Sequence, residues 1–148
     1  MNNEATKCLK SPCKECPFSR TVVPGTLGGS GVEVYIGQAQ GPFYLPCHAH
    51  TDYADPNWKK DDGKPQCAGA AIYRSNIGVA KLMPKEIHIL PPDKEKVFRA
   101  PEEFIMHHQQ VPSFIAQMFL QVYPPQMLMM MELSKQETWI KKATPQPL

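Results

Sequence analysis

Apolar residues recur with helical spacing in several short segments of this chain, separated by glycine and proline. Between Ser30 and Gly41 they recur every three or four positions, which is the spacing of one helix face. Ser30 and Glu33 have the spacing of a capping box, and Gly41-Pro42 ends the pattern. The sequence therefore predicts a helix here with Ser30 as its N-cap.

The middle of the chain predicts shorter elements. We expect residues 43–47 to be extended and a second short helix to begin at Cys67 and run through Tyr73. Glu86–Leu90 is predicted to be a short edge strand, stopped by the two prolines that follow it.

Residues 100–142 contain no glycine and are predicted to be helical. The run Pro101-Glu102-Glu103 has the features of a first helical turn, with proline at N1 and acids at the positive end of the dipole. A further helix is expected to open at Ser113, and a last one to span 126–142 after Pro124-Pro125. The side chains expected to face inward from the helix at Ser113 are those of Phe114, Ile115, Met118, Phe119 and Val122.

Together these elements predict a mostly α fold with irregular loops, although a small α+β fold is also possible. The 16 prolines limit the length of every element. We expect one domain over residues 1–148, with a loop-rich metal-stapled module at 11–80 followed by a helical segment at 100–142.

Composition narrows the class of protein. Apolar residues make up 42% of the chain and charged residues 20%, with a net charge of +2, which is a globular composition. No basic stripe follows the sequence, so nucleic-acid binding is possible but not favoured. No run of about 18 apolar residues predicts a membrane span, and the N-terminus has no apolar signal region. We therefore expect a cytoplasmic protein whose thiols stay reduced.

The cysteines carry the strongest chemical signal. Cys13 and Cys16 form a C-x2-C knuckle, whose backbone amides can stabilise two thiolates at one centre. Cys47 and Cys67 lie further along in constrained settings, after Pro46 and before Ala68-Gly69. Four thiolates in a reducing compartment indicate a metal centre with Cys13, Cys16, Cys47 and Cys67 as its ligands.

The identity of the metal is left open by the spacing. One knuckle with two scattered cysteines, together with the Cys16-Pro17 dipeptide, favours a [4Fe-4S] cluster. A structural zinc ion is the alternative. Cys8 could also replace one ligand, since Cys8, Cys13 and Cys16 have the C-x4-C-x2-C spacing of plant-type [2Fe-2S] proteins.

The histidines are expected to play secondary parts. His48 follows a ligand directly, so its predicted role is to donate a ring N–H to a cysteine sulfur, with ligation in a Cys3His zinc site as the alternative. His50 is expected to be a polar loop residue. His107-His108 is expected to be a surface pair on a helix.

The motifs Cys13-x-x-Cys16-Pro17-Phe18, Cys47-His48 and Cys67-Ala68-Gly69 resemble an uncharacterised family of small bacterial and bacteriophage proteins. The resemblance covers roughly residues 11–80 and implies a four-cysteine metal or cluster site with Cys8 outside it. It also includes Arg74-Ser75-Asn76, and we place Arg74 with His48 among the residues expected to contact the centre.

The function expected from these observations is that of a binding, assembly or regulatory module held together by its metal. Catalysis is not favoured, because no hydrolase, kinase or deaminase motif occurs and four thiolates leave a zinc ion no open position. A redox carrier or sensor is one alternative, and a zinc-stapled nucleic-acid binder is another. The methionine-rich run Met127–Met131 is expected to contact a protein partner or a second copy of the chain.

Overall fold

The computed structural model describes residues 11–47 and 66–143, with side chains described as far as residue 136. Within these residues the chain is mostly helical, which confirms the predicted fold class. β-pairing in the same residues is limited to two isolated bridges, Ser19 with Val97 and Pro46 with Gln66. The elements are α1 (Val32–Gln40), α2 (Ala68–Asn76), the short 3₁₀ helix η3 (Ala80–Leu82), α3 (Pro101–Gln109), α4 (Ser113–Val122) and α5 (Pro125–Ala143).

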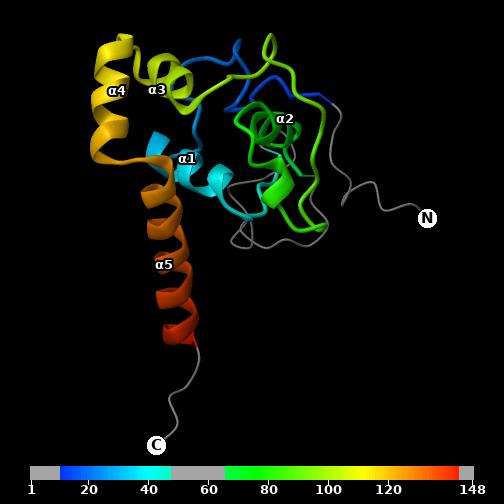
Figure 1. Ribbon diagram of the computed structural model, residues 1–148, viewed down its shortest axis with the longest axis vertical. Helices are drawn as coiled ribbons and strands as arrows, with labels where there is room; N and C mark the ends of the chain where they lie inside the picture. Colours follow the sequence, from blue (N-terminus) through cyan, green and yellow to red (C-terminus); the bar gives the residue numbers. More distant parts are fainter. Residues whose placement is uncertain (1–10, 48–65, 144–148) are drawn as a thin grey trace, which may run out of the picture.

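Helix α1 lies at the centre of this arrangement. It contacts α2, α3 and α5, whereas α4 packs on α3 (Figure 1). Figure 1 shows α4 and α5 following one another along one side of the molecule, with α2 on the opposite side of α1. The cysteine module and the C-terminal helices are therefore joined through α1 and α3.

The predicted N-cap of α1 is wrong by one residue. Gly31 holds the N-cap position in an extended conformation, with φ −87° and ψ 169°, and no side chain caps the helix there. The backbone N–H of Ser30 is already used in a turn, donating to the Leu27 carbonyl at 3.1 Å. The Glu33 side chain folds back over Gly31, where a Cβ atom would overlap it. The expected capping box therefore does not form.

Helices α1 and α5 approach closely because two glycines line the contact. A Cβ atom on Gly37 would lie 2.6 Å from the Leu128 carbonyl oxygen, and one on Gly41 would lie 2.8 Å from Cγ of Met129. Beside them the buried Glu132 accepts a hydrogen bond from the Gln38 amide at 3.0 Å and pairs with Lys135 at 2.6 Å. The buried side of α5 is thus Leu128 and Glu132, with Met129 half-buried against α1.

An aromatic cluster fills the core between the cysteine module and α3. Phe18 lies 5.0 Å from Tyr73 and 5.3 Å from Phe104, measured between ring centroids. Phe98 meets Phe104 edge-on at 5.8 Å. Tilted and edge-on pairs of this kind stabilise a core beyond the apolar area they bury. This cluster joins the knuckle loop, α2 and α3 into one hydrophobic core.

Two side chains at the end of α2 hold residues 90–98 in place through hydrogen bonds. Ser75 donates a hydrogen bond to the Leu90 carbonyl at 2.5 Å. The amide of Asn76 donates to the carbonyls of Asp93 and Phe98 at 3.1 and 3.0 Å, and its oxygen accepts from the Asp93 N–H at 2.9 Å. These bonds order residues 90–98, a segment that has no regular structure.

The edge strand predicted at Glu86–Leu90 does not form. The Gln66 side chain occupies the place of a partner strand: its amide donates to the Glu86 carbonyl at 2.9 Å and accepts from the His88 N–H at 3.0 Å. A single side-chain amide satisfies both backbone groups, so no ladder extends from them. Residues 86–90 are therefore an extended segment held by one glutamine.

The start of α3 is confirmed, with Pro101 in its first turn and Phe104 and Ile105 fully buried. The start of α4 at Ser113 is also confirmed, but the face predicted to point inward is wrong. Among the side chains of α4 the buried one is Ala116, whereas Phe114, Met118 and Val122 are 62%, 57% and 62% exposed. Because α4 packs on α3 through its small residue, its large apolar side chains point away from the core.

Candidate metal centre

The predicted knuckle is a tight turn that places its second cysteine in the core. The Cys16 N–H donates to the Cys13 carbonyl at 3.1 Å, and the Ser19 N–H donates to the Cys16 carbonyl at 3.1 Å. Cys16 is only 1% exposed, whereas Cys13 is half-buried at the edge of the hydrophobic core. Pro17 and Phe18, both buried, continue the chain inward from the knuckle.

Cys67 comes to the same place from the other side. It is the N-cap of α2, and its Sγ accepts a hydrogen bond from the Ala70 N–H at 3.4 Å. The Cys16 and Cys67 sulfurs lie 3.6 Å apart. Two residues separated by 51 positions are thereby brought to one buried point.

Gly69 makes this approach possible. A Cβ atom on Gly69 would overlap the Cys16 sulfur and would lie 3.1 Å from Cβ of Phe18. Any larger residue would push the knuckle away from the start of α2. The Cys67-Ala68-Gly69 motif is therefore explained by packing: the cysteine supplies a sulfur and the glycine leaves room for its partner.

The two sulfurs differ in their readiness to ionise. A hydrogen bond donated by the Cys16 thiol lowers the pKa of Cys67, and the Ala70 and Gly69 N–H groups and the Arg74 charge lower it further, against the effect of burial. The same hydrogen bond, together with burial, raises the pKa of Cys16. Amide donors and positive charge at a helix start favour a thiolate. Of the two thiols, that of Cys67 therefore loses its proton more readily.

Arg74 supplies the nearest buried positive charge. Its side chain is 2% exposed and donates hydrogen bonds to the backbone carbonyls of Ala39, Gly41 and Phe43 at 2.9, 2.9 and 2.8 Å, closing the end of α1. Burial lowers the pKa of Arg74 to about 10, so the guanidinium remains charged at neutral pH, and the Cys67 thiolate favours that charge. Arg74 acts on the cysteines through its charge while its hydrogen bonds hold α1.

Cys47 follows a short backbone pairing that joins the segment before it to Cys67. The Cys67 N–H donates to the Leu45 carbonyl at 2.8 Å, next to the bridge between Pro46 and Gln66. Alternate residues of an extended segment point to the same side, so Cys47 shares a face with Leu45, which pairs directly with Cys67. Cys47 is buried.

Of the four predicted ligands, the structure brings Cys16 and Cys67 together. Within residues 11–47 and 66–136, no group of three or more His, Cys, Asp or Glu side chains is close enough to hold one metal ion. Cys13 and Cys47 lie on the flanking segments and do not complete a ligand set in this arrangement. Cys8, His48 and His50 lie outside the described residues.

The donor pair can be tested against the proposed metals. A tetrahedral zinc ion with Zn–S bonds of about 2.3 Å holds its sulfurs about 3.8 Å apart. The observed 3.6 Å between Cys16 and Cys67 fits two ligands of one such ion. A cubane cluster spreads its cysteines over four irons, one sulfur to each, and so needs a wider separation. The pair as it stands therefore fits a single ion more closely.

His107 and His108 are not the surface pair that the sequence predicts. His108 is buried: its Nδ1 accepts from the Gly25 N–H at 3.0 Å and its Nε2 donates to the Pro17 carbonyl at 2.7 Å. His107 Nε2 lies 2.6 Å from the Val22 carbonyl. Both imidazoles tie α3 to the loop that follows the knuckle, a role that helical spacing alone does not reveal.

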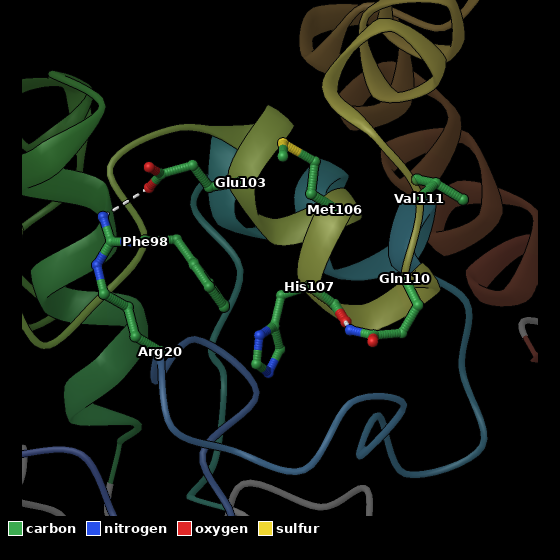
Figure 2. Close-up of a pocket in the computed structure, with 7 residues that line it drawn as sticks. All are labelled: Arg20, Phe98, Glu103, Met106, His107, Gln110 and Val111. Carbon is green, nitrogen blue, oxygen red and sulfur yellow. Dashed lines mark hydrogen bonds and ion pairs between the residues drawn. The ribbon is translucent and has the colours of Figure 1, made fainter.

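An open cavity of about 440 Å³ lies beside His107, and no cysteine lines it (Figure 2). Figure 2 shows the Arg20 guanidinium reaching Glu103, with an N–O distance of 2.6 Å, next to the Phe98 ring. The Arg20 Nε also donates to the Lys94 carbonyl at 2.8 Å. The Arg20 guanidinium and the Glu103 carboxylate are thus paired with each other in the cavity wall. The lining residues are Arg20, Phe98, Glu103, Met106, His107, Gln110 and Val111.

Comparison with known proteins gives no match: no family model matches the chain, and no curated protein or solved structure matches it significantly. The resemblance to a cysteine-motif family therefore stays a prediction. In the part of the chain that the structure describes, no helix is both long and apolar enough to cross a bilayer.

Proposed function

We propose that this protein is a small metal-centre module in which Cys13, Cys16, Cys47 and Cys67 hold the metal and the C-terminal helices contact a protein partner. The observation that carries the proposal is the 3.6 Å separation of the Cys16 and Cys67 sulfurs in the buried space left by Gly69. A chain with reduced thiols in these positions belongs in a reducing compartment, which supports a cytoplasmic location.

In this proposal the metal stabilises the fold by joining separate segments of the chain. Cys16 and Cys67 fix the knuckle to α2, and α2 in turn fastens α1 and residues 90–98. Metal binding would contribute directly to folding, as in other small metal-bound modules. The sulfur geometry supports zinc, while the Cys16-Pro17 dipeptide and the single knuckle support [4Fe-4S].

Nucleic-acid binding is less well supported by the described residues. Arg74, whose charge acts on the cysteine pair, is buried and bonded to backbone carbonyls. Arg20, which follows the knuckle in the chain, is paired with Glu103. Phosphate contacts need exposed and unpaired cations, and these two side chains are not available for that role.

The test is metal analysis of anaerobically purified protein, combined with single substitutions. We expect one centre per chain: a colourless protein with one zinc ion, or a brown protein with a broad absorption band if the centre is [4Fe-4S]. Cys16→Ser and Cys67→Ser should each lose the metal, together with several kcal/mol of folding free energy, because structural zinc binding is worth on the order of 10 kcal/mol.

The matched control is Cys8→Ser, which should keep both metal and stability. A Cys8→Ser variant that loses the centre while Cys67→Ser retains it would assign the ligands to Cys8, Cys13, Cys16 and Cys47 instead. A metal-free wild-type protein that folds with full stability would overturn the metal-centre proposal as a whole.

A further inference from the structure

Helices α4 and α5 each leave one apolar stripe exposed. On α4 it consists of Phe114, Met118 and Val122, spaced four residues apart, with Ile115 beside them. On α5 it consists of Met127, Met130 and Met131, which are 45%, 58% and 44% exposed. Exposed apolar surface of this extent marks an interaction site.

The absence of charge on this surface indicates which kind of partner it can bind. Residues 109–131 contain no Asp, Glu, Lys or Arg. A helix that lies on a lipid surface carries Lys and Arg along its polar face, and α4 has none. Two copies of an uncharged face do not repel each other electrostatically, so this face can pack against the same face of a second copy.

Charges do occur at the two ends of the surface, and they are of opposite sign. Glu102 belongs to α3, and its carboxylate reaches the first turn of α4, where it accepts hydrogen bonds from Ser113 and Gln117 that lower its pKa and keep it ionised. Lys135 lies along α5, is 61% exposed and pairs with the buried Glu132 of the same helix at 2.6 Å, which leaves its side chain as the exposed charge at this end. Two copies packed antiparallel would therefore bring an acidic end against a basic end twice.

The spacing of these residues is symmetric along the chain. Pro124 lies midway between Met118 and Met130, and also midway between Ser113 and Lys135. In Figure 1, α5 follows α4 on the same side of the molecule. A two-fold axis near Pro124 would then place Met118 of one copy opposite Met130 of the other.

We propose that a second copy of this chain covers the α4–α5 surface in an antiparallel two-fold dimer, with Met118 facing Met130 across the axis. This rests on the proposed function in one respect, since it names the partner of the proposed binding surface. In such an isologous contact each residue pair occurs twice. Phe114 lies near the methionines of the other copy, where sulfur–aromatic contacts are favourable.

The test is sedimentation of full-length, metal-loaded protein and of two charge variants. The wild type should sediment at twice the 16.6 kDa of one chain. Met118→Lys and Met130→Glu should each sediment as single chains, because a charge then enters the apolar contact twice. An equimolar mixture of the two variants should recover the doubled mass, since the opposite charges face each other in the mixed pair.

The control is Leu82→Lys, an equally drastic change at a 77% exposed apolar residue of η3, beside α2. It should leave the doubled mass intact. A wild type that stays a single chain throughout the micromolar range overturns the dimer, as do charge variants that still pair. Variants that dissociate and do not recover on mixing overturn the antiparallel register. Metal content is measured on every sample, so a failure of the metal proposal is seen separately.

Discussion

Tyr73 shows how a single buried polar atom affects this core. Its ring packs against Phe18, but its hydroxyl is buried with no hydrogen-bond partner among the described residues. Burial also raises the pKa of Tyr73 well above its ordinary value. A buried hydroxyl without a partner costs about 1–3 kcal/mol in lost hydration.

Replacing Tyr73 by Phe should therefore raise the free energy of unfolding, by about 1 kcal/mol, in denaturant titrations of the metal-loaded protein. The matched control is Tyr35→Phe, whose hydroxyl donates to the Leu27 carbonyl at 2.9 Å. That variant should lose about 1 kcal/mol. Equal losses from the two substitutions would mean that the Tyr73 hydroxyl has a hydrogen-bond partner in the folded protein.

Among the cysteines, the sequence predicts a set of four ligands, and the structure brings two of them, Cys16 and Cys67, to one buried point. Both could be predicted as members of that set because cysteine is the side chain that supplies a thiolate ligand. Nothing in the spacing shows that Gly69 fits against Cys16, since this depends on how α2 is placed. The four backbone carbonyls around Arg74 likewise belong to segments more than 30 residues away, so its role could not be predicted locally.

Among the elements, α3 ends in a conformation that its residue does not favour. Gln110, its C-cap, has φ 54° and ψ 50°, the left-handed region that glycine adopts without cost. Its side chain offsets part of the cost by donating to the His107 carbonyl at 2.8 Å.

Gln110→Gly should therefore stabilise the protein, by about 0.5–1 kcal/mol, through relief of the left-handed strain. Gln110→Ala, which keeps the strain and loses the side-chain hydrogen bond, should destabilise it by a similar amount. Thermal unfolding of both variants measures the difference. Should the glycine variant unfold at a lower temperature than the alanine variant, the conformation of Gln110 is not left-handed.

The elements also show which predictions a sequence supports. The starts of α2 and α3 could be predicted because Cys67 and Pro101 act locally, within one helical turn. Ser113 begins α4, but its side chain does not cap the helix, whose N-cap is Pro112. The inward face of α4 could not, because helical spacing finds an apolar stripe and does not tell a core from an interface. Glu86–Leu90 failed as a strand for a similar reason, since its partner is the side chain of Gln66.

For the molecule as a whole, His108 links the cysteine module to the C-terminal helices. Burial lowers its pKa, and the neighbouring His107 adds to this effect, against the hydrogen bond to the Pro17 carbonyl. The folded protein therefore holds His108 neutral, and protonation removes the acceptor for the Gly25 N–H. A group with a lowered pKa contributes stability that is complete above its unfolded pKa and is lost as the pH falls below it.

We therefore expect the wild type to lose stability as the pH falls below about 6.5, by at most about 1.4 kcal/mol per pH unit for this one group. His108→Gln should lower stability at pH 7.5 but flatten this part of the profile. The quantity to measure is the difference between the two profiles, because cysteine protonation affects both proteins alike. Parallel profiles would show that His108 does not carry the dependence.

The hydrogen bonds that close this fold join distant parts of the chain, and that affects how a ribosome can produce it. His108 reaches Pro17 across 91 residues, and Glu132 reaches Gln38 across 94. A chain synthesised from its N-terminus makes Cys16 long before the residues of α3 that cover it exist. The Cys16 thiol consequently spends most of translation uncovered, and a metal that it binds at that stage would enter the nascent chain before the aromatic core closes over the knuckle.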